Sequence, residues 1–188
     1  MSAGTEPATA NPARHAVHFA GGEDDLADSV SSYIGAAVHA GKTAIVIATP
    51  EHRRAFEARL AGAFDVEAVR VRGRLIALNA AEMMKLVLIG ARPDPPSLDL
   101  VLGSLIRRAL TDSPAVGVYG EMAALLWDAG QVTAAVELEA LWSRLGQELG
   151  ISVLCGYPAR LASGPDHAAA VREICQLHTA VTGVQPPA

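Results

Sequence analysis

Glu121 is the residue whose position most clearly suggests chemistry. It follows a short apolar run at residues 115–119, which is typical of a buried strand, and precedes residues 123–127, which are typical of a helix. In open α/β sheets, ligands bind in the crevice beyond the carboxyl ends of the strands. The sequence therefore predicts that the Glu121 carboxylate contacts a ligand at this turn.

A second group of side chains could bind a metal or take part in a reaction. It consists of Cys155, Cys175 and His178. Cys155 ends an apolar run, which predicts that its thiol emerges at the same sheet edge as Glu121. Cys175 and His178 are three residues apart and therefore share one face of a helix. Thiolate and imidazole are ligands of zinc and similar metals, with Glu121 available as a fourth ligand. A redox pair of thiols, or a hydrogen-bonded, half-buried thiol and imidazole, fits the same spacing.

The same side chains raise the alternative of a small enzyme. Glu121 with His178 could act as a general acid–base pair, and Cys155 as a nucleophile. The sequence does not place these groups within hydrogen-bonding distance of one another. We therefore favour a protein without catalytic activity and expect no cofactor.

Trp142 belongs to an apolar stripe with Leu138 and Leu141, and Glu139 lies beside it. Such a stripe usually packs into a core, although an indole next to an acid could also form the wall of a small apolar pocket. Both interpretations stay open. His15 and His18 point to opposite faces of a regular strand, so at most one of them should reach a shared site. His52 and Arg53 are most simply surface side chains.

The glycine-rich segments are not expected to form a nucleotide site. Gly41-Lys42-Thr43 resembles the end of a phosphate-binding loop, but Ala36 stands where that loop needs its first glycine, and a strand follows instead of a helix. Residues 20–25, after the first strand, contain three consecutive acids and no lysine, so their charge would repel a triphosphate. These acids are expected to stabilise a helix N-terminus, and an ATPase is disfavoured.

Alternating strands and helices must position these residues. The pattern predicts a three-layer α/β domain with a mostly parallel central sheet, because apolar strands alternate with amphipathic helices. Residues 1–13 are expected to be a disordered tail, 14–182 a single domain and 183–188 a C-terminal tail. Strands are predicted at residues 15–19, 43–48, 115–119 and 151–155, with one or two shorter ones within 64–71 and 74–78. Helices are predicted at residues 24–40, 50–61, 80–90, 97–110, from 123 to about 149 with a break near Gly130, and 165–181, with Ser97 as an N-cap.

Composition excludes several classes of protein. The chain has 188 residues, 51% of them hydrophobic, which suits one well-packed globular domain. A net charge of −5 without a basic patch argues against direct nucleic-acid binding. No apolar run is long enough to span a membrane, and no targeting segment is recognisable, so we expect a cytoplasmic protein with two free thiols.

Five motifs in this order resemble the MEDS (methanogen/methylotroph sensory) domain family. They are His15-Ala-Val-His-Phe19, Val118-Tyr-Gly-Glu121-Met122, Leu138-Glu139-x-x-Trp142, Leu154-Cys155-Gly-Tyr157-Pro158 and Ile174-Cys175-x-x-His178. The resemblance covers nearly the whole chain after the tail. One departure is Ala20, where the family often has an aromatic residue, which leaves the identity of the ligand open.

The resemblance implies a non-enzymatic sensory domain with a RecA-like fold of the circadian-clock ATPase type and a degenerate nucleotide site. It implies a small, hydrophobic, hydrocarbon-derived ligand. The resemblance also implies a regulatory protein partner, namely a kinase, an anti-sigma antagonist or a DNA-binding regulator. Self-association is an alternative. The chain ends soon after His178, so no attached output module is expected. The expected ligand-binding residues are His15, His18, Glu121, Glu139, Trp142, Cys155, Tyr157, Cys175 and His178.

Overall fold

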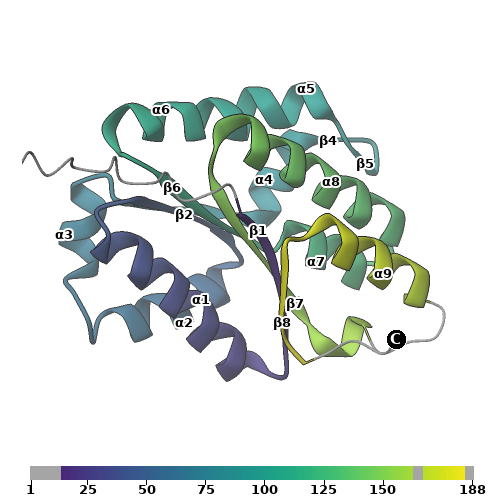
Figure 1. The fold of residues 1–188 in the computed structure, drawn as a ribbon, viewed down its shortest axis with the longest axis horizontal. Coiled ribbons are helices and arrows are strands. Elements are labelled where there is room, and N and C mark those ends of the chain that lie inside the picture. The colour runs from purple at the N-terminus through teal and green to yellow at the C-terminus, as the bar shows by residue number, and fades with distance from the viewer. Residues whose placement is uncertain (1–13, 163–166, 185–188) are drawn as a thin grey trace, which may run out of the picture.

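A computed structural model describes residues 14–162 and 167–184 of the chain. The predicted N-terminal tail, residues 185–188 and the predicted start of the last helix at Pro165 lie outside the described residues. Within them, a twisted sheet is covered by helices on both faces (Figure 1).

Six parallel strands form the central sheet in the order β3-β2-β6-β7-β1-β8. Every residue of the second strand is buried, as expected for a strand covered on both faces. The predicted parallel α/β architecture is thereby confirmed. The strands are β1 (Arg14–Ala20), β2 (Thr43–Ala48), β3 (Leu75–Asn79), β6 (Val116–Gly120), β7 (Ser152–Pro158) and β8 (Ala180–Gly183).

Two apolar clusters fill the space between the sheet and its helices. The first contains side chains from α1, α2 and α3 on one face, and the second contains side chains from α4 to α9 on the other. The helices are α1 (Glu23–His39), α2 (Pro50–Leu60), α3 (Val66–Val71), α4 (Ala80–Val87), α5 (Pro95–Leu98), a π-helical turn (Asp99–Gly103), α6 (Ser104–Asp112), α7 (Met122–Asp128), α8 (Val132–Leu149), a 3-10 turn (Ala159–Ala162) and α9 (Ala168–Leu177). None of these helices is long and apolar enough to cross a membrane.

Several sequence-based boundaries are corrected by the structure. Residues 66–71 form a helix instead of a strand, because Asp65 caps its first turn by accepting a hydrogen bond from the backbone of Ala68. Asp94 caps the helix that we expected Ser97 to cap. Helix α4 ends at Val87, before the short antiparallel pair β4 (Leu88–Ile89) and β5 (Arg92–Pro93).

The end of the described chain differs most from the prediction. Helix α9 ends at Leu177, and the following residues form β8, an edge strand that pairs with β1. His178 is therefore the C-cap of the helix and not part of its face. Backbone hydrogen bonds from Thr179 to His15 and from Val184 to Phe19 fix this edge strand. Gly183, where we expected a C-terminal tail to begin, is the last residue of this strand.

Candidate functional site

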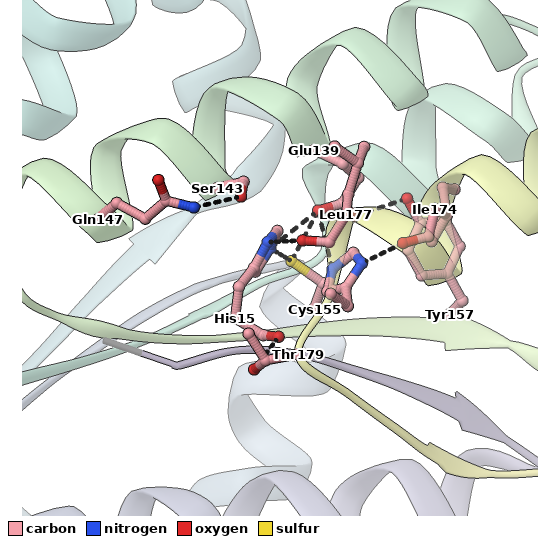
Figure 2. Close-up of polar contacts among 10 residues, drawn as sticks. His15, Glu139, Ser143, Gln147, Cys155, Tyr157, Ile174, Leu177 and Thr179 are labelled. Atoms are coloured by element: carbon pink, nitrogen blue, oxygen red, sulfur yellow. Dashed lines mark hydrogen bonds and ion pairs between the residues drawn. The ribbon is translucent and has the colours of Figure 1, made fainter. Parts of the chain in front are cut away.

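Five side chains form a buried polar cluster between the sheet and helices α8 and α9. Glu139 projects from α8, His15 from β1, and Cys155 and Tyr157 from β7 (Figure 2), while His178 follows α9. Side chains alternate between the two faces of a strand, and the odd-numbered residues of β1 and β7 face α8. The cluster residues of these two strands are therefore odd-numbered. We call these five residues the Glu139 cluster.

Glu139 accepts the hydrogen bonds that hold the cluster together. The Tyr157 hydroxyl donates to Oε1 at 2.7 Å, and the Cys155 thiol donates to Oε2 at 3.0 Å. Nε2 of His15 and Nε2 of His178 lie 3.3 and 3.4 Å from the same Oε2 atom. One carboxylate oxygen thus faces a thiol and two imidazoles.

Burial alone would raise the pKa of Glu139, which is 0% exposed. Interaction with the side chains of His15 and His178 outweighs that effect and holds the pKa of this carboxyl well below its ordinary value. Burial, and then the negative charge of Glu139, raise the pKa values of Cys155 and Tyr157 well above their ordinary ranges. At neutral pH the cluster therefore contains a carboxylate, a protonated thiol and a protonated phenol.

A second polar cluster surrounds Glu121 at the carboxyl ends of β2 and β6. Glu121 is 3% exposed and accepts hydrogen bonds from the backbone N–H of Thr49, the Tyr119 hydroxyl at 3.2 Å and Nδ1 of His52 at 2.6 Å. Nε2 of His52 lies 2.8 Å from Glu23 of α1. His52 therefore bridges two carboxylates, one buried and one exposed.

The hydrogen bond from His52 to Glu121 raises the pKa of His52 to about 9. Partial burial opposes this shift, whereas the charge of Glu121 and the contact with Glu23 add to it. His52 is thus an imidazolium at neutral pH, and it links α1, α2 and the start of α7 electrostatically.

This pKa predicts a pH-dependent stability. Because the folded pKa of His52 lies above 6.5, its contribution is complete below pH 6.5 and is lost as the pH rises through about 9. The free energy of unfolding should fall by about 1–2 kcal/mol across this window, less than the full shift implies, because His52 is partly solvated. Urea unfolding at a series of pH values measures it. The fall should disappear in Glu121→Gln, and an equal fall in that variant would contradict the assignment.

The structure separates residues that we expected to meet. Glu121 contacts His52 and Tyr119 on the side of α1 and α2, whereas Cys155 and His178 contact Glu139 on the side of α8. The predicted convergence of Glu121, Cys155 and His178, and with it the acid–base pair of Glu121 and His178, is corrected. The reason is that Cys155 points from β7 toward α8 and His178 follows α9 on that side, whereas Glu121 directly follows β6 and contacts α2 at the carboxyl ends of the strands.

The predicted metal trio is corrected as well. Among the described residues, the four groups that could each offer one ligand atom within 4.8 Å of one another are His15, Glu139, Cys155 and His178. Cys175 is half-buried outside this set, and both cysteines are free thiols. His18 points to the opposite face from His15, as expected, where its Nδ1 lies 3.1 Å from the Thr182 hydroxyl.

Sequence reasoning missed the role of His52. We assigned it to the surface, yet it follows the end of β2 by four residues, directly beside the end of β6. Pairing of parallel strands in this order brings their carboxyl ends together, which the linear sequence does not reveal. The usable signal was Thr49-Pro50, a helix cap and first-turn proline that place His52 in the first turn of α2, facing the sheet edge.

A cavity of about 140 Å³ opens beside Glu121 and His52. Leu26, Ala124 and Leu125 give it an apolar surface, and Arg160 lies at its rim, where it is paired with Asp128. Trp142 does not line this cavity; it is 1% exposed and lies in the apolar core under α8.

Comparison with protein families settles the relationship. The model of MEDS, the methanogen/methylotroph, DcmR sensory domain, matches residues 14–179. The chain belongs to the MEDS family. Comparison with curated protein sequences gives no significant match.

Solved structures show the fold of this MEDS domain. A KaiC-like protein from the hyperthermophilic archaeon Pyrococcus horikoshii is similar with a TM-score of 0.57 and 10% identity, over 94% of this chain and 75% of that one. The likeness confirms the expected RecA-like architecture. In the MEDS domain the turn after β1 is stabilised from within, since the Gly21 N–H donates to the Asp25 carboxylate at 2.8 Å.

Proposed function

We propose that this MEDS domain senses a small hydrocarbon-derived molecule that binds in the cavity beside Glu121. The observation that supports this proposal is the combination of an apolar lining from Leu26, Ala124 and Leu125 with one buried carboxylate and one imidazolium, Glu121 and His52. Binding sites of small molecules commonly join apolar walls to a few fixed polar groups. The position at the carboxyl ends of the strands is the usual ligand position in this class of fold.

The size of the cavity limits the ligand. A cavity of about 150 Å³ lined by apolar side chains binds benzene, so a cavity of about 140 Å³ suits a molecule of that size or smaller. Short alcohols and halogenated alkanes meet this limit. Their apolar part would contact Leu26 and Leu125, and a hydroxyl or halogen would face the Glu121–His52 pair.

The same cavity offers a route for signalling. Its lining comes from α1 through Glu23 and Leu26, from α2 through His52, and from α7 through Ala124. A ligand that binds one arrangement of these helices more tightly shifts the population toward it, by no more than its difference in affinity. We propose that a protein partner, namely a kinase, an anti-sigma antagonist or a DNA-binding regulator, or a second copy of the chain, responds to this shift.

Thermal unfolding with small probes tests the proposal. Short alcohols and dichloromethane should be screened from micromolar to millimolar concentration, and a binding probe at 100 times its Kd should raise Tm by about 5–10 °C. Ala124→Leu fills the cavity and should abolish this shift. Ala36→Leu, on the exposed side of α1, is the matched control and should retain it.

Two outcomes would overturn the proposal. One is that none of the small probes tested stabilises the wild-type protein. The other is an equal ligand-induced shift in wild type and Ala124→Leu, which would place binding elsewhere. The ligand-induced change in Tm is compared, not Tm itself, so a destabilised variant remains informative.

A further inference from the structure

We propose that His15, Glu139, Cys155 and His178 form a buried site for one divalent cation of the zinc type. This site lies between the sheet and helices α8 and α9, shares no residue with the cavity beside Glu121, and does not depend on the proposed sensing of hydrocarbons. Three features support such a site: the distances between the four ligand atoms, the hydrogen bonds that orient them and an unpartnered buried nitrogen.

Three of the six distances between the four ligand atoms fit tetrahedral coordination. With zinc–ligand bonds of about 2.0–2.3 Å, neighbouring ligand atoms of a tetrahedron lie about 3.3–3.8 Å apart. Oε2 of Glu139 is 3.3 Å from Nε2 of His15 and 3.4 Å from Nε2 of His178, and that His15 atom is 3.4 Å from Sγ of Cys155. A fourth pair, Sγ of Cys155 and Oε2 of Glu139, is closer at 3.0 Å, and the other two pairs lie within 4.8 Å. Small shifts of the side chains are needed to complete the geometry.

Backbone carbonyls orient both imidazoles for coordination. Nδ1 of His15 lies 3.2 Å from the carbonyl of Leu177, and Nδ1 of His178 lies 2.6 Å from that of Ile174. Because a carbonyl oxygen only accepts hydrogen bonds, Nδ1 carries the hydrogen in each ring. A neutral ring then directs the lone pair of Nε2 into the cluster, which is the usual arrangement of a metal-binding histidine.

Glu139 is oriented in the same way. The Tyr157 hydroxyl donates to Oε1, which leaves Oε2 directed at the other three ligand atoms. This outer hydrogen bond matches the second shell of known metal sites, in which ligating carboxylates are themselves hydrogen-bonded.

His178 supplies an independent observation. Its side chain is 0% exposed, and its Nε2 atom has no hydrogen-bond partner although it is directed at Glu139. With Nδ1 hydrogen-bonded to a carbonyl, Nε2 of each ring can face the Glu139 oxygen only by carrying a hydrogen toward it or by sharing a cation with it. A divalent cation would take the place of that hydrogen and be coordinated by Nε2.

The charges also balance. Two neutral imidazoles, one carboxylate and one thiolate carry a total of −2, which a divalent cation neutralises, and a neutral buried site avoids the cost of an unpaired charge. The thiol must lose its proton to become a ligand. Each cation that forms an S–metal bond therefore breaks the S–H bond of Cys155 and releases that proton to solvent, together with any hydrogen carried by the two Nε2 atoms.

The cation has a route to the site. A pocket of about 240 Å³ at the amino end of β1 is lined by His15 and His178 and by Ser143 and Gln147 of α8. Figure 2 shows Ser143 and Gln147 on α8 beside His15. The mixture of thiolate, imidazole and carboxylate favours zinc, cobalt or another borderline metal over magnesium or calcium.

Cobalt titration of the full chain tests the proposal. Protein stripped with a chelator and kept reduced should bind one equivalent of Co²⁺, with visible absorption of a tetrahedral site and a thiolate-to-cobalt charge-transfer band, and Zn²⁺ should displace it. Titration calorimetry in buffers of different ionisation enthalpy should show proton release. Tyr157→Phe, which removes only the outer hydrogen bond, should weaken binding by about 10–100-fold.

The cysteine variants decide the ligand set. Cys155→Ser should lose the charge-transfer band, whereas Cys175→Ser should keep it. Failure of wild type to bind Co²⁺ or Zn²⁺ at micromolar protein, or loss of the band in Cys175→Ser with its retention in Cys155→Ser, would overturn the proposal. If Cys155→Ser does not fold, proton release and the charge-transfer band of the wild-type protein still test the thiolate ligand.

Discussion

Glu139→Ala is expected to lower the free energy of unfolding by about 3–5 kcal/mol, which is the cost of removing one partner from a buried charged group. The Tyr157 hydroxyl and the Cys155 thiol would lose their acceptor, and His15 and His178 would lose the carboxylate that they face. The variant would also leave a space in the interior between α8 and the sheet. Urea unfolding followed by circular dichroism measures the loss.

Glu137→Ala is the matched control, because it removes the same side chain two residues earlier in the same helix. Glu137 pairs with Arg92 at the surface, and an exposed pair of this kind contributes about 0–1 kcal/mol. Glu139→Gln keeps the volume and an acceptor for Tyr157, so its cost should lie between the two. A loss under 1 kcal/mol in Glu139→Ala would contradict the description of Glu139 as a buried, charged centre of the cluster.

Trp142→Ala is expected to cost a similar amount, about 3–5 kcal/mol, through loss of apolar burial and creation of a cavity. The indole is 1% exposed and lies against Gly120 of β6. Denaturant unfolding followed by circular dichroism measures the loss. Trp142→Phe should recover a large part of the stability, because an aromatic ring still fills the space.

This pair of variants distinguishes the two interpretations that the sequence left open. If Trp142 is a core residue, both variants change stability and leave the thermal shift by small probes unchanged. A Trp142→Phe protein of near-normal stability that no longer responds to the probes would show instead that the indole contacts the ligand.

Local patterns predicted the fold well because they report directly on burial. The uninterrupted apolar run of β2 indicated a strand covered on both faces, and the helical spacing from Leu26 to Val38 indicated α1. Where local signals were weak, the prediction failed. Residues 66–71 alternate like a strand, but the Asp65 cap makes them a helix, and β8 is stable because it pairs with β1.

The candidate site shows the same difference between local and long-range information. The sequence by itself determined the parallel α/β architecture, the family and most of the polar residues that matter, since motifs such as Leu138-Glu139-x-x-Trp142 are local. Only the tertiary structure decided their partners: Glu121 pairs with His52, and Glu139 gathers His15, Cys155 and His178. The physical reason is that strand order and the alternation of side chains across a sheet assign residues to one face or the other. Contacts such as that between His15 and Cys155, 140 positions apart, follow from that assignment and not from spacing along the chain.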